Sequence, residues 1–197
     1  MPAKKNKKGA SACAPATPVF QRYIGVDPGS KGAIAVLDAE GRLIRVHDAK
    51  SDDDLATTVI TKVIREESVQ GPVAFAVERA VAFQFNNGKS LVKLGLASGA
   101  AYGVAVALGA WVDWPTASTW KRKLGVTSDK GSSKALAREL FGDALPKVCR
   151  DDKAEAALIA FWLYTKHNKT MDVQNDAKNE PQEAGVSRKR STSRRAA

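Results

Sequence analysis

The sequence predicts an α/β domain built on a mixed five-stranded sheet with helices on both faces. Three short β-branched and apolar runs, residues 22–27, 32–38 and 41–46, follow one another through tight turns, which is typical of an antiparallel meander. Two further runs, residues 73–77 and about 110–114, each follow a helical pattern, so both are expected to join the sheet through crossovers. Helical patterns dominate the rest of the chain.

The helices have their own signals. Three aspartates at 52–54 can cap a helix whose apolar residues recur every four positions up to Val63, and Gly71 with Pro72 ends it. The other helices are expected from about Lys89, over residues 118–124, over residues 132–141, and from Asp151 to about His167.

Charge is the clearest feature of the composition. The chain has 197 residues and a formal net charge of +10, which indicates a polyanionic partner. Residues 1–20 and 169–197 are basic and too polar or low in complexity to bury a core, so both are expected to be disordered arms around a domain spanning 21–168. Such arms either contact nucleic acid or only aid solubility. Two cysteines exclude a disulfide framework and a Cys-rich zinc site.

Residues 94–112 carry no charge and are nearly long enough to cross a bilayer. Gly and Ala dominate this run rather than Leu and Ile, which favours a buried helix, and no membrane partner is expected. Gly95, Gly99 and Gly103 recur every four residues and share one helix face. That face allows close approach of another backbone and is a candidate packing or dimer surface.

Carboxylates follow two of the predicted strands. Asp27 closes the first strand, and Glu78 is the first polar residue after the apolar run 73–77. Asp152 and Glu155 are three residues apart and share the face of the last helix that its apolar residues form. Unpaired charges on a core-facing stripe are expensive, so a compensating cation is expected.

The identity of that cation is open at this point. Lys153 or Arg150 could form a salt bridge, and a divalent metal would compensate better if the two strand-end acids converge on the same place. Asp151 competes with Asp152 for the site, because periodicity does not separate them. Acids without a His cluster favour magnesium or manganese over zinc. Two such ions can hydrolyse a phosphodiester, and together with the positive charge this predicts a nuclease.

Four short motifs occur along the chain in a fixed order, with spacings that suit a single family pattern. They are Ile24-Gly25-Val26-Asp27-Pro28-Gly29-Ser30, Ala76-Val77-Glu78-Arg79, the helix from Lys93-Leu94-Gly95 to Gly103, and Asp152-Lys153-Ala154-Glu155-Ala156. Over about residues 22–167 they resemble the motifs of RuvC-type Holliday junction resolvases, which have an RNase H-like fold. Glu155 stands where the commonest bacterial pattern has Asp, and here the chain is more similar to phage and organelle members.

The resemblance implies a crossover junction endodeoxyribonuclease that acts in DNA recombination and repair. Such an enzyme is a homodimer that binds four-way junction DNA and makes paired nicks with ligatable ends. The resemblance implies two Mg²⁺ ions per active site, for which Mn²⁺ substitutes, held by Asp27, Glu78, Asp152 and Glu155, with Lys121 stabilising phosphate charge. The expected location is the cytoplasm or nucleoid of a bacterium or phage-infected cell, with an organelle left open.

Basic and aromatic side chains supply the expected DNA contacts. They are Phe83, Phe85, Lys89, Lys121, Arg122, Lys123, Lys130 and Lys134. The resemblance places Lys121 and Lys130 near the scissile phosphate. Phe83 and Phe85 flank Gln84 in a loop, where they either wedge between bases or anchor the core.

Three other functions compete with this one. An RNA-processing nuclease of the YqgF type belongs to the same superfamily. An actin-like or sugar-kinase-like ATP-binding domain has a similar first hairpin, but it needs two domains of this kind and this chain is too short. A non-catalytic junction-binding protein is compatible with the arms, yet it gains nothing from carboxylates that face phosphate.

Overall fold

The computed structural model of the chain describes residues 19–29, 31–49, 55–81, 88–127, 129 and 131–179. Of the predicted arms, 1–20 and 169–197, residues 1–18 and 180–197 lie outside this part. Phe20 is buried in the core and residues 169–179 are helical, so these positions are not arm. The chain divides into two units, Met1–Tyr164 and Thr165–Ala197. The sheet and the candidate site belong to the first unit.

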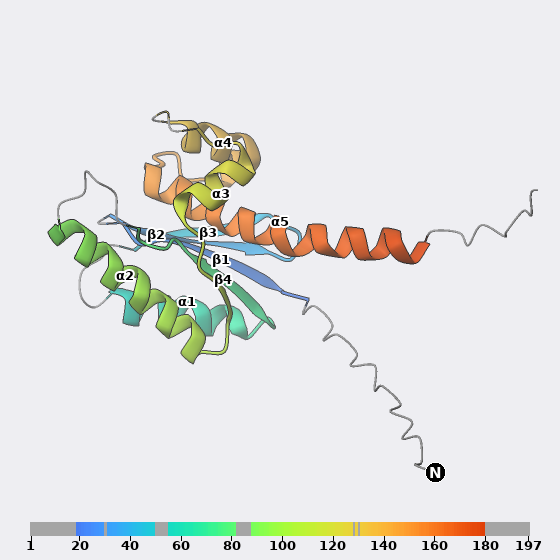
Figure 1. Ribbon diagram of the computed structural model, residues 1–197, viewed down its shortest axis with the longest axis horizontal. Helices are drawn as coiled ribbons and strands as arrows, with labels where there is room; N and C mark the ends of the chain where they lie inside the picture. Colours follow the sequence, from blue (N-terminus) through green and yellow to red (C-terminus); the bar gives the residue numbers. More distant parts are fainter. Residues whose placement is uncertain are drawn as a thin grey trace, which may run out of the picture. The chain divides into compact units, whose positions relative to one another are not determined.

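Five strands form one mixed sheet in the order β3-β2-β1-β4-β5 (Figure 1). The strands are β1 (Arg22–Asp27), β2 (Ala33–Asp38), β3 (Leu43–Asp48), β4 (Val73–Val77) and β5 (Trp111–Asp113). The first three pair antiparallel, whereas β4 lies parallel to β1 and β5 lies parallel to β4. The predicted meander with two crossover strands is confirmed. Because β1 and β4 are parallel, their carboxyl ends meet at the same edge of the sheet.

Helices cover both faces of this sheet, as predicted. They are α1 (Leu55–Ser68), α2 (Gly88–Ala107), α3 (Ala117–Leu124), α4 (Ser132–Phe141) and α5 (Asp151–Asn179), with a short 3₁₀ turn, η1 (Gly142–Ala144), after α4. Figure 1 shows α1 and α2 on one side of the sheet and α3, α4 and the start of α5 on the other. Alternation along β4 explains the two layers, because Phe75 and Val77 pack in the core with α1 and α2, while Ala74 and Ala76 pack in the core with α5.

Helix α5 lies directly on β1 because Gly25 has no side chain. A Cβ at this position would lie 2.3 Å from the carbonyl oxygen of Ala156 and 2.3 Å from the amide nitrogen of Ala160. Two residues before Gly25, the Tyr23 ring contacts the Tyr164 ring, with centroids 5.3 Å apart. The helix therefore runs antiparallel to the strand. Two strand residues advance about as far as one helical turn, so Asp27 comes next to the first turn of α5.

Helix α5 ends at Asn179, well beyond the end predicted near His167. The prediction followed the apolar stripe, which fades after that point in the sequence. Backbone hydrogen bonding continues where the stripe stops, because a helix can extend through a polar sequence once it has been nucleated.

Helix α2 is not the buried helix that its composition predicts. Its buried residues are Ser98, Ala101 and Ala105. Val92 and Leu96 are 62% and 70% exposed, and Val106 is 50% exposed. The helix contacts the sheet through a narrow stripe of small residues, and its outer face is apolar as well. Composition could not distinguish the two faces, because both lack charge. Among the described residues α2 alone is long and apolar enough to cross a membrane, which by itself is weak evidence for a span.

Candidate active site

Four acidic side chains come together from three elements. Asp27 ends β1 and Glu78 directly follows β4, and the two strands are held in register by a 3.1 Å hydrogen bond from the Glu78 amide to the Val26 carbonyl. The first turns of α5 contribute Asp152 and Glu155. The charges of Glu78, Glu155 and Asp152 all act on Asp27. The two strand-end acids and the helix pair therefore lie in the same region of the fold.

Asp27 is partly buried at the carboxyl end of β1. Burial raises the pKa of Asp27 from 3.8 to about 7. The Gly29 amide, which donates to Oδ1 at 2.9 Å, lowers the pKa, whereas the neighbouring carboxylates raise it. No ion pair to Asp27 forms within the described part of the chain. A partly buried carboxylate of this kind, surrounded by other carboxylates, favours the binding of a cation.

Helices α3 and α4 hold the two glutamates. Trp120 Nε1 donates to Glu78 Oε2 at 2.9 Å. Burial raises the pKa of Glu78, and the hydrogen bond from Trp120 lowers it. The negative charge of Glu155 raises this pKa further, whereas the positive charge of Lys121 lowers it. Lys121 Nζ donates to Glu155 Oε1 at 2.7 Å, and Ser133 Oγ donates to the same oxygen at 2.9 Å. Consecutive residues on α3 therefore contact different acids.

Asp152 is held by a salt bridge from Arg150. The Arg150 Nη2 atom lies 2.7 Å from Asp152 Oδ2 and 2.7 Å from Asp48 Oδ1. Lys153 pairs with Asp48 instead, at 3.2 Å. Of the two predicted salt-bridge partners, Lys153 and Arg150, only Arg150 pairs with Asp152 in the described part of the chain.

The structure also separates Asp152 from Asp151. The Asp152 side chain is 15% exposed and its charge acts on Asp27. The Asp151 side chain is 67% exposed and pairs with Lys134 at 3.0 Å. Asp152 therefore belongs to the acidic cluster, and Asp151 lies on the surface beside it.

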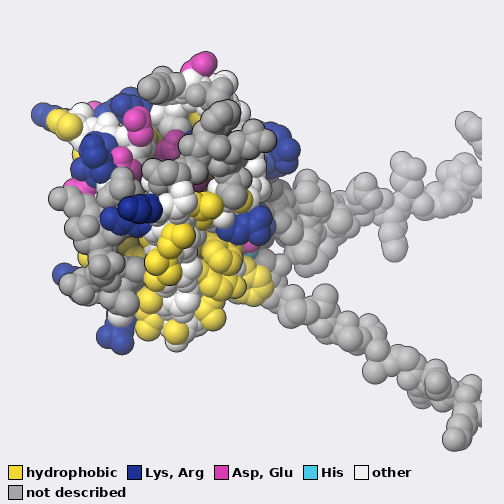
Figure 2. Space-filling view, turned by 60° about the vertical axis from the view of Figure 1, so that its left-hand side comes forward, with side chains coloured by type: hydrophobic (Ala, Val, Ile, Leu, Met, Phe, Trp, Pro, Cys, Tyr) yellow, Lys and Arg dark blue, Asp and Glu magenta, His cyan; other side chains and the backbone are white. Residues whose placement is uncertain are grey.

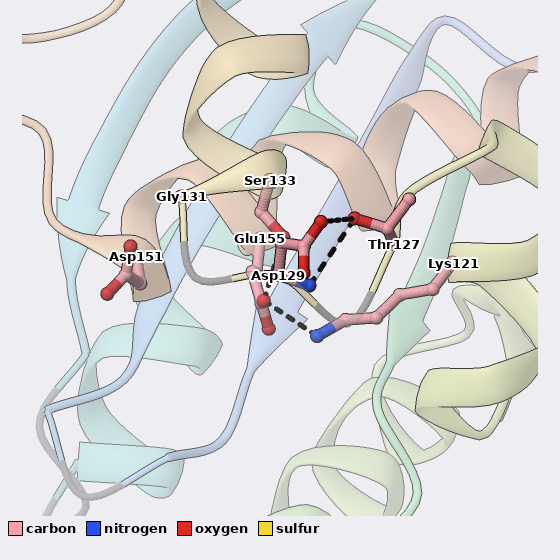
Figure 3. Close-up of a pocket in the computed structure, with 7 residues that line it drawn as sticks. All are labelled: Lys121, Thr127, Asp129, Gly131, Ser133, Asp151 and Glu155. Atoms are coloured by element: carbon pink, nitrogen blue, oxygen red, sulfur yellow. Dashed lines mark hydrogen bonds and ion pairs between the residues drawn. The ribbon is translucent and has the colours of Figure 1, made fainter.

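A pocket of about 410 Å³ opens beside this cluster. It is lined by Lys121, Thr127, Asp129, Gly131, Ser133, Asp151 and Glu155. Figure 3 shows the Lys121 amine and the Ser133 hydroxyl directed at the Glu155 carboxylate, which is the one member of the cluster that reaches the pocket wall. The pocket gives a ligand access to the Glu155 side of the site.

The donor set fits a hard divalent cation. As the side chains stand, no three acidic, His or Cys residues in the described part of the chain are close enough to hold one metal ion. The four acids nevertheless offer carboxylate oxygens alone, and Asp27 has no cationic partner among the described residues. Magnesium and manganese prefer such oxygens.

Two solved structures decide the fold. No family model matches the chain, and no curated protein matches it. A structure of Thermus thermophilus RuvC is similar to the chain with a TM-score of 0.58 and 22% sequence identity, over 76% of this chain and 97% of that one. The chain has the RuvC fold. A second structure, T. thermophilus RuvC in complex with a Holliday junction substrate, gives a TM-score of 0.56 and 20% identity over 77% and 98% of the two chains. The RNase H-like expectation is confirmed.

The predicted DNA-binding side chains are distributed over several elements of this RuvC fold. Arg122 and Lys123 are exposed near the end of α3, and Lys89 is exposed at the start of α2. Lys134 is exposed on α4 and is paired with an acid, while Lys121 is partly buried against Glu155. Phe83, Phe85 and Lys130 lie outside the described residues.

Sequence reasoning missed the contacts that Trp120 and Ser133 make in the site. Ser133 is in the first turn of α4, where a serine is unremarkable in sequence, and its 7% exposure depends on packing against α5. Trp120 directly precedes three basic residues, and a tryptophan at such a position is typical of a core residue. Neither contact has a local sequence signal, because the partners are 22 and 42 positions away.

The buried Asp27 carboxyl predicts a pH-dependent stability. Below about pH 4 it is protonated in both the folded and the unfolded chain. Between about pH 4 and pH 7 the unfolded chain ionises first, so the free energy of unfolding falls as the pH rises, and it stays low above pH 7. We expect the Tm of the metal-free wild type, relative to Asp27→Asn, to follow this course in thermal unfolding with EDTA. A Tm difference that is constant across the pH range would contradict the assigned environment of Asp27.

Proposed function

We propose that this protein is a Holliday junction resolvase, a Mg²⁺-dependent, structure-selective endonuclease that nicks four-way DNA junctions symmetrically during recombination and repair. The observation that carries the proposal is the cluster of Asp27, Glu78, Asp152 and Glu155 at one edge of a sheet with the RuvC fold. The junction bound in one solved RuvC structure supports four-way DNA as the substrate. The formal net charge of +10 favours a polyanionic substrate as well.

The acids and the lysine have distinct roles in this mechanism. Asp27, Glu78, Asp152 and Glu155 would hold two Mg²⁺ ions, or Mn²⁺ in their place. When bound, such a pair supplies an activated water and stabilises the leaving oxygen of the phosphodiester. Lys121, which is partly buried beside Glu155, brings positive charge to the phosphate at the pocket. The exposed Arg122 and Lys123 contact backbone phosphates farther from the reaction.

Substrate selectivity tests the proposal. The protein is incubated with a synthetic four-way junction, a linear duplex of the same sequence and a structured RNA, each with Mg²⁺ or with EDTA. We expect nicking of the junction alone and only with Mg²⁺. Cleavage of the RNA in place of the junction would instead support an RNA-processing nuclease. Binding of the junction without cleavage would support a non-catalytic junction protein.

We infer that the outer face of α2 is the dimer surface. A Cβ at Gly95, Gly99 or Gly103 would meet nothing within 4 Å among the described residues, so the predicted glycine stripe is open to an incoming helix. Hydrophobic side chains gather on the face of the molecule where α2 comes forward (Figure 2), and Leu96 is 70% exposed there. Contiguous apolar surface of this kind marks an interface. Two copies related by a twofold axis supply the two active sites that paired nicks require.

Leu96→Glu is expected to convert the dimer to a monomer, because it places a charge on this exposed apolar face. Light scattering coupled to gel filtration at micromolar concentration measures the change. Leu140→Glu on α4 is the control, since Leu140 is 40% exposed and lies on another surface; it should remain dimeric. A monomeric wild type, or binding of the wild type to lipid vesicles in place of self-association, would contradict the assignment.

A further inference from the structure

We propose that Trp120 and Ser133 are positioning residues that determine which oxygen of Glu78 and of Glu155 is presented to the metal ions. The proposal rests on the proposed function, because it concerns the same acidic cluster. Its basis is that each glutamate accepts a hydrogen bond from a buried, uncharged donor on one oxygen. No described residue donates a hydrogen bond to the other oxygen of either glutamate.

Trp120 is a rigid donor to Glu78. Its side chain is completely buried, and its Nε1 atom lies 2.9 Å from Glu78 Oε2. Helix α3 is fixed at its end by Gly125, which has a left-handed backbone (φ 72°) and closes the helix by donating to a carbonyl of the last turn. An indole has only two side-chain torsions, both fixed here by packing. The hydrogen bond therefore holds Glu78 Oε2, and Oε1 remains available to a ligand.

Ser133 has the same role toward Glu155. The residue is 7% exposed, and its hydroxyl donates to Glu155 Oε1 at 2.9 Å. Helix α4 is anchored by the buried residues Ala137 and Phe141, so the hydroxyl is supported by a packed element. A glutamate has one more rotatable bond than an aspartate, and fixing it in advance removes an entropic cost of ligand binding. Glu155 Oε2 remains for a ligand.

Ser133 and Lys121 donate to the same oxygen of Glu155 but have different roles. Both donate to Oε1, but Lys121 carries a charge and is 30% exposed at its side chain, whereas Ser133 is neutral and buried. Lys121 can therefore move to a phosphate without releasing Glu155, because Ser133 still holds the carboxylate. A neutral donor also leaves the full negative charge of the glutamate available to a cation.

Trp120→Phe and Ser133→Ala remove the two donors while keeping most of the packing. We expect each to weaken Mn²⁺ binding to the DNA-free protein by roughly tenfold or more, as measured by calorimetry. The Mg²⁺ concentration for half-maximal junction cleavage should rise by a similar factor, with the KM for the junction unchanged. Ser133→Thr keeps the hydroxyl and is expected to retain wild-type Mn²⁺ affinity. Thermal unfolding in EDTA monitors the fold of each variant.

Two other residues provide matched controls. Trp111→Phe replaces an indole of β5 that pairs with Ala74, at the end of β4 away from Glu78, and Ser132→Ala removes a hydroxyl that donates to the Thr127 carbonyl. Both should keep wild-type Mn²⁺ affinity. Wild-type affinity in Ser133→Ala, equal losses in the controls, or a wild type that binds no Mn²⁺ would overturn the proposal. A wild type that binds Mn²⁺ but cleaves no junction refutes the resolvase function alone, because calorimetry still tests the two donors.

Discussion

Asp27→Asn is expected to abolish junction cleavage, with a loss of roughly three orders of magnitude or more, while the protein stays folded. Asp27 is the acid on which the charges of Glu78, Asp152 and Glu155 all act, so its carboxylate is the common neighbour of the proposed ligands. Asparagine has the same shape but carries no negative charge. Single-turnover nicking of a four-way junction with Mg²⁺ measures the loss, and a gel-shift assay with Ca²⁺ measures junction binding.

The same substitution is expected to raise thermal stability in EDTA, because it removes a buried charge that has no cationic partner in the described part of the chain. This gain distinguishes loss of chemistry from loss of fold. Asp151→Asn is the matched control, since Asp151 is adjacent to the cluster but 67% exposed; it should cleave within a few-fold of wild type. Cleavage by Asp27→Asn at the wild-type rate would show that Asp27 is not in the active site.

Gly25→Ala is expected to have the largest effect on the fold. The added Cβ would lie 2.3 Å from both the Ala156 carbonyl oxygen and the Ala160 amide nitrogen. Both atoms belong to the backbone of α5, so no side chain can rotate to relieve the clash. The helix must move away from β1, at a cost of about 3 kcal/mol or more in the free energy of unfolding. Urea denaturation measures this loss.

The substitution should also abolish cleavage, because displacement of α5 separates its acids from Asp27. Gly88→Ala is the control, since a Cβ at the start of α2 would meet none of the described residues within 4 Å. It should leave the free energy of unfolding within about 0.5 kcal/mol of wild type. A Gly25→Ala protein as stable as wild type would contradict the direct contact between β1 and α5.

Local patterns were sufficient to predict the sheet and the acids. Alternation over residues 22–46 predicts the meander, and β4 matches its predicted range of 73–77. The spacing of Asp152 and Glu155 on an apolar stripe predicts their place beside the sheet, where Ile159 on the same stripe is completely buried. These features depend on neighbouring residues of one element, which a single sequence reveals.

Contacts between distant elements could not be predicted in this way. The choice between Asp151 and Asp152 depends on how α5 is rotated on β1, and Gly25 sets that rotation. The donors Trp120 and Ser133 reach the glutamates only because α3 and α4 fold back over the start of α5. The exposure of the outer face of α2 could not be predicted either, because apolar residues lie all around the helix and no polar side marks the exposed face.

The most direct test of the resolvase function is the chemistry of the nicks. A four-way junction with a central homologous core is cut with wild-type protein and Mg²⁺, the nicks on both strands are mapped, and the products are treated with DNA ligase. We expect nicks at symmetric positions on two opposed strands, each with a 5′-phosphate and a 3′-hydroxyl that ligase reseals without further processing. Junction binding with no cleavage under any Mg²⁺ or Mn²⁺ condition would contradict the proposed function.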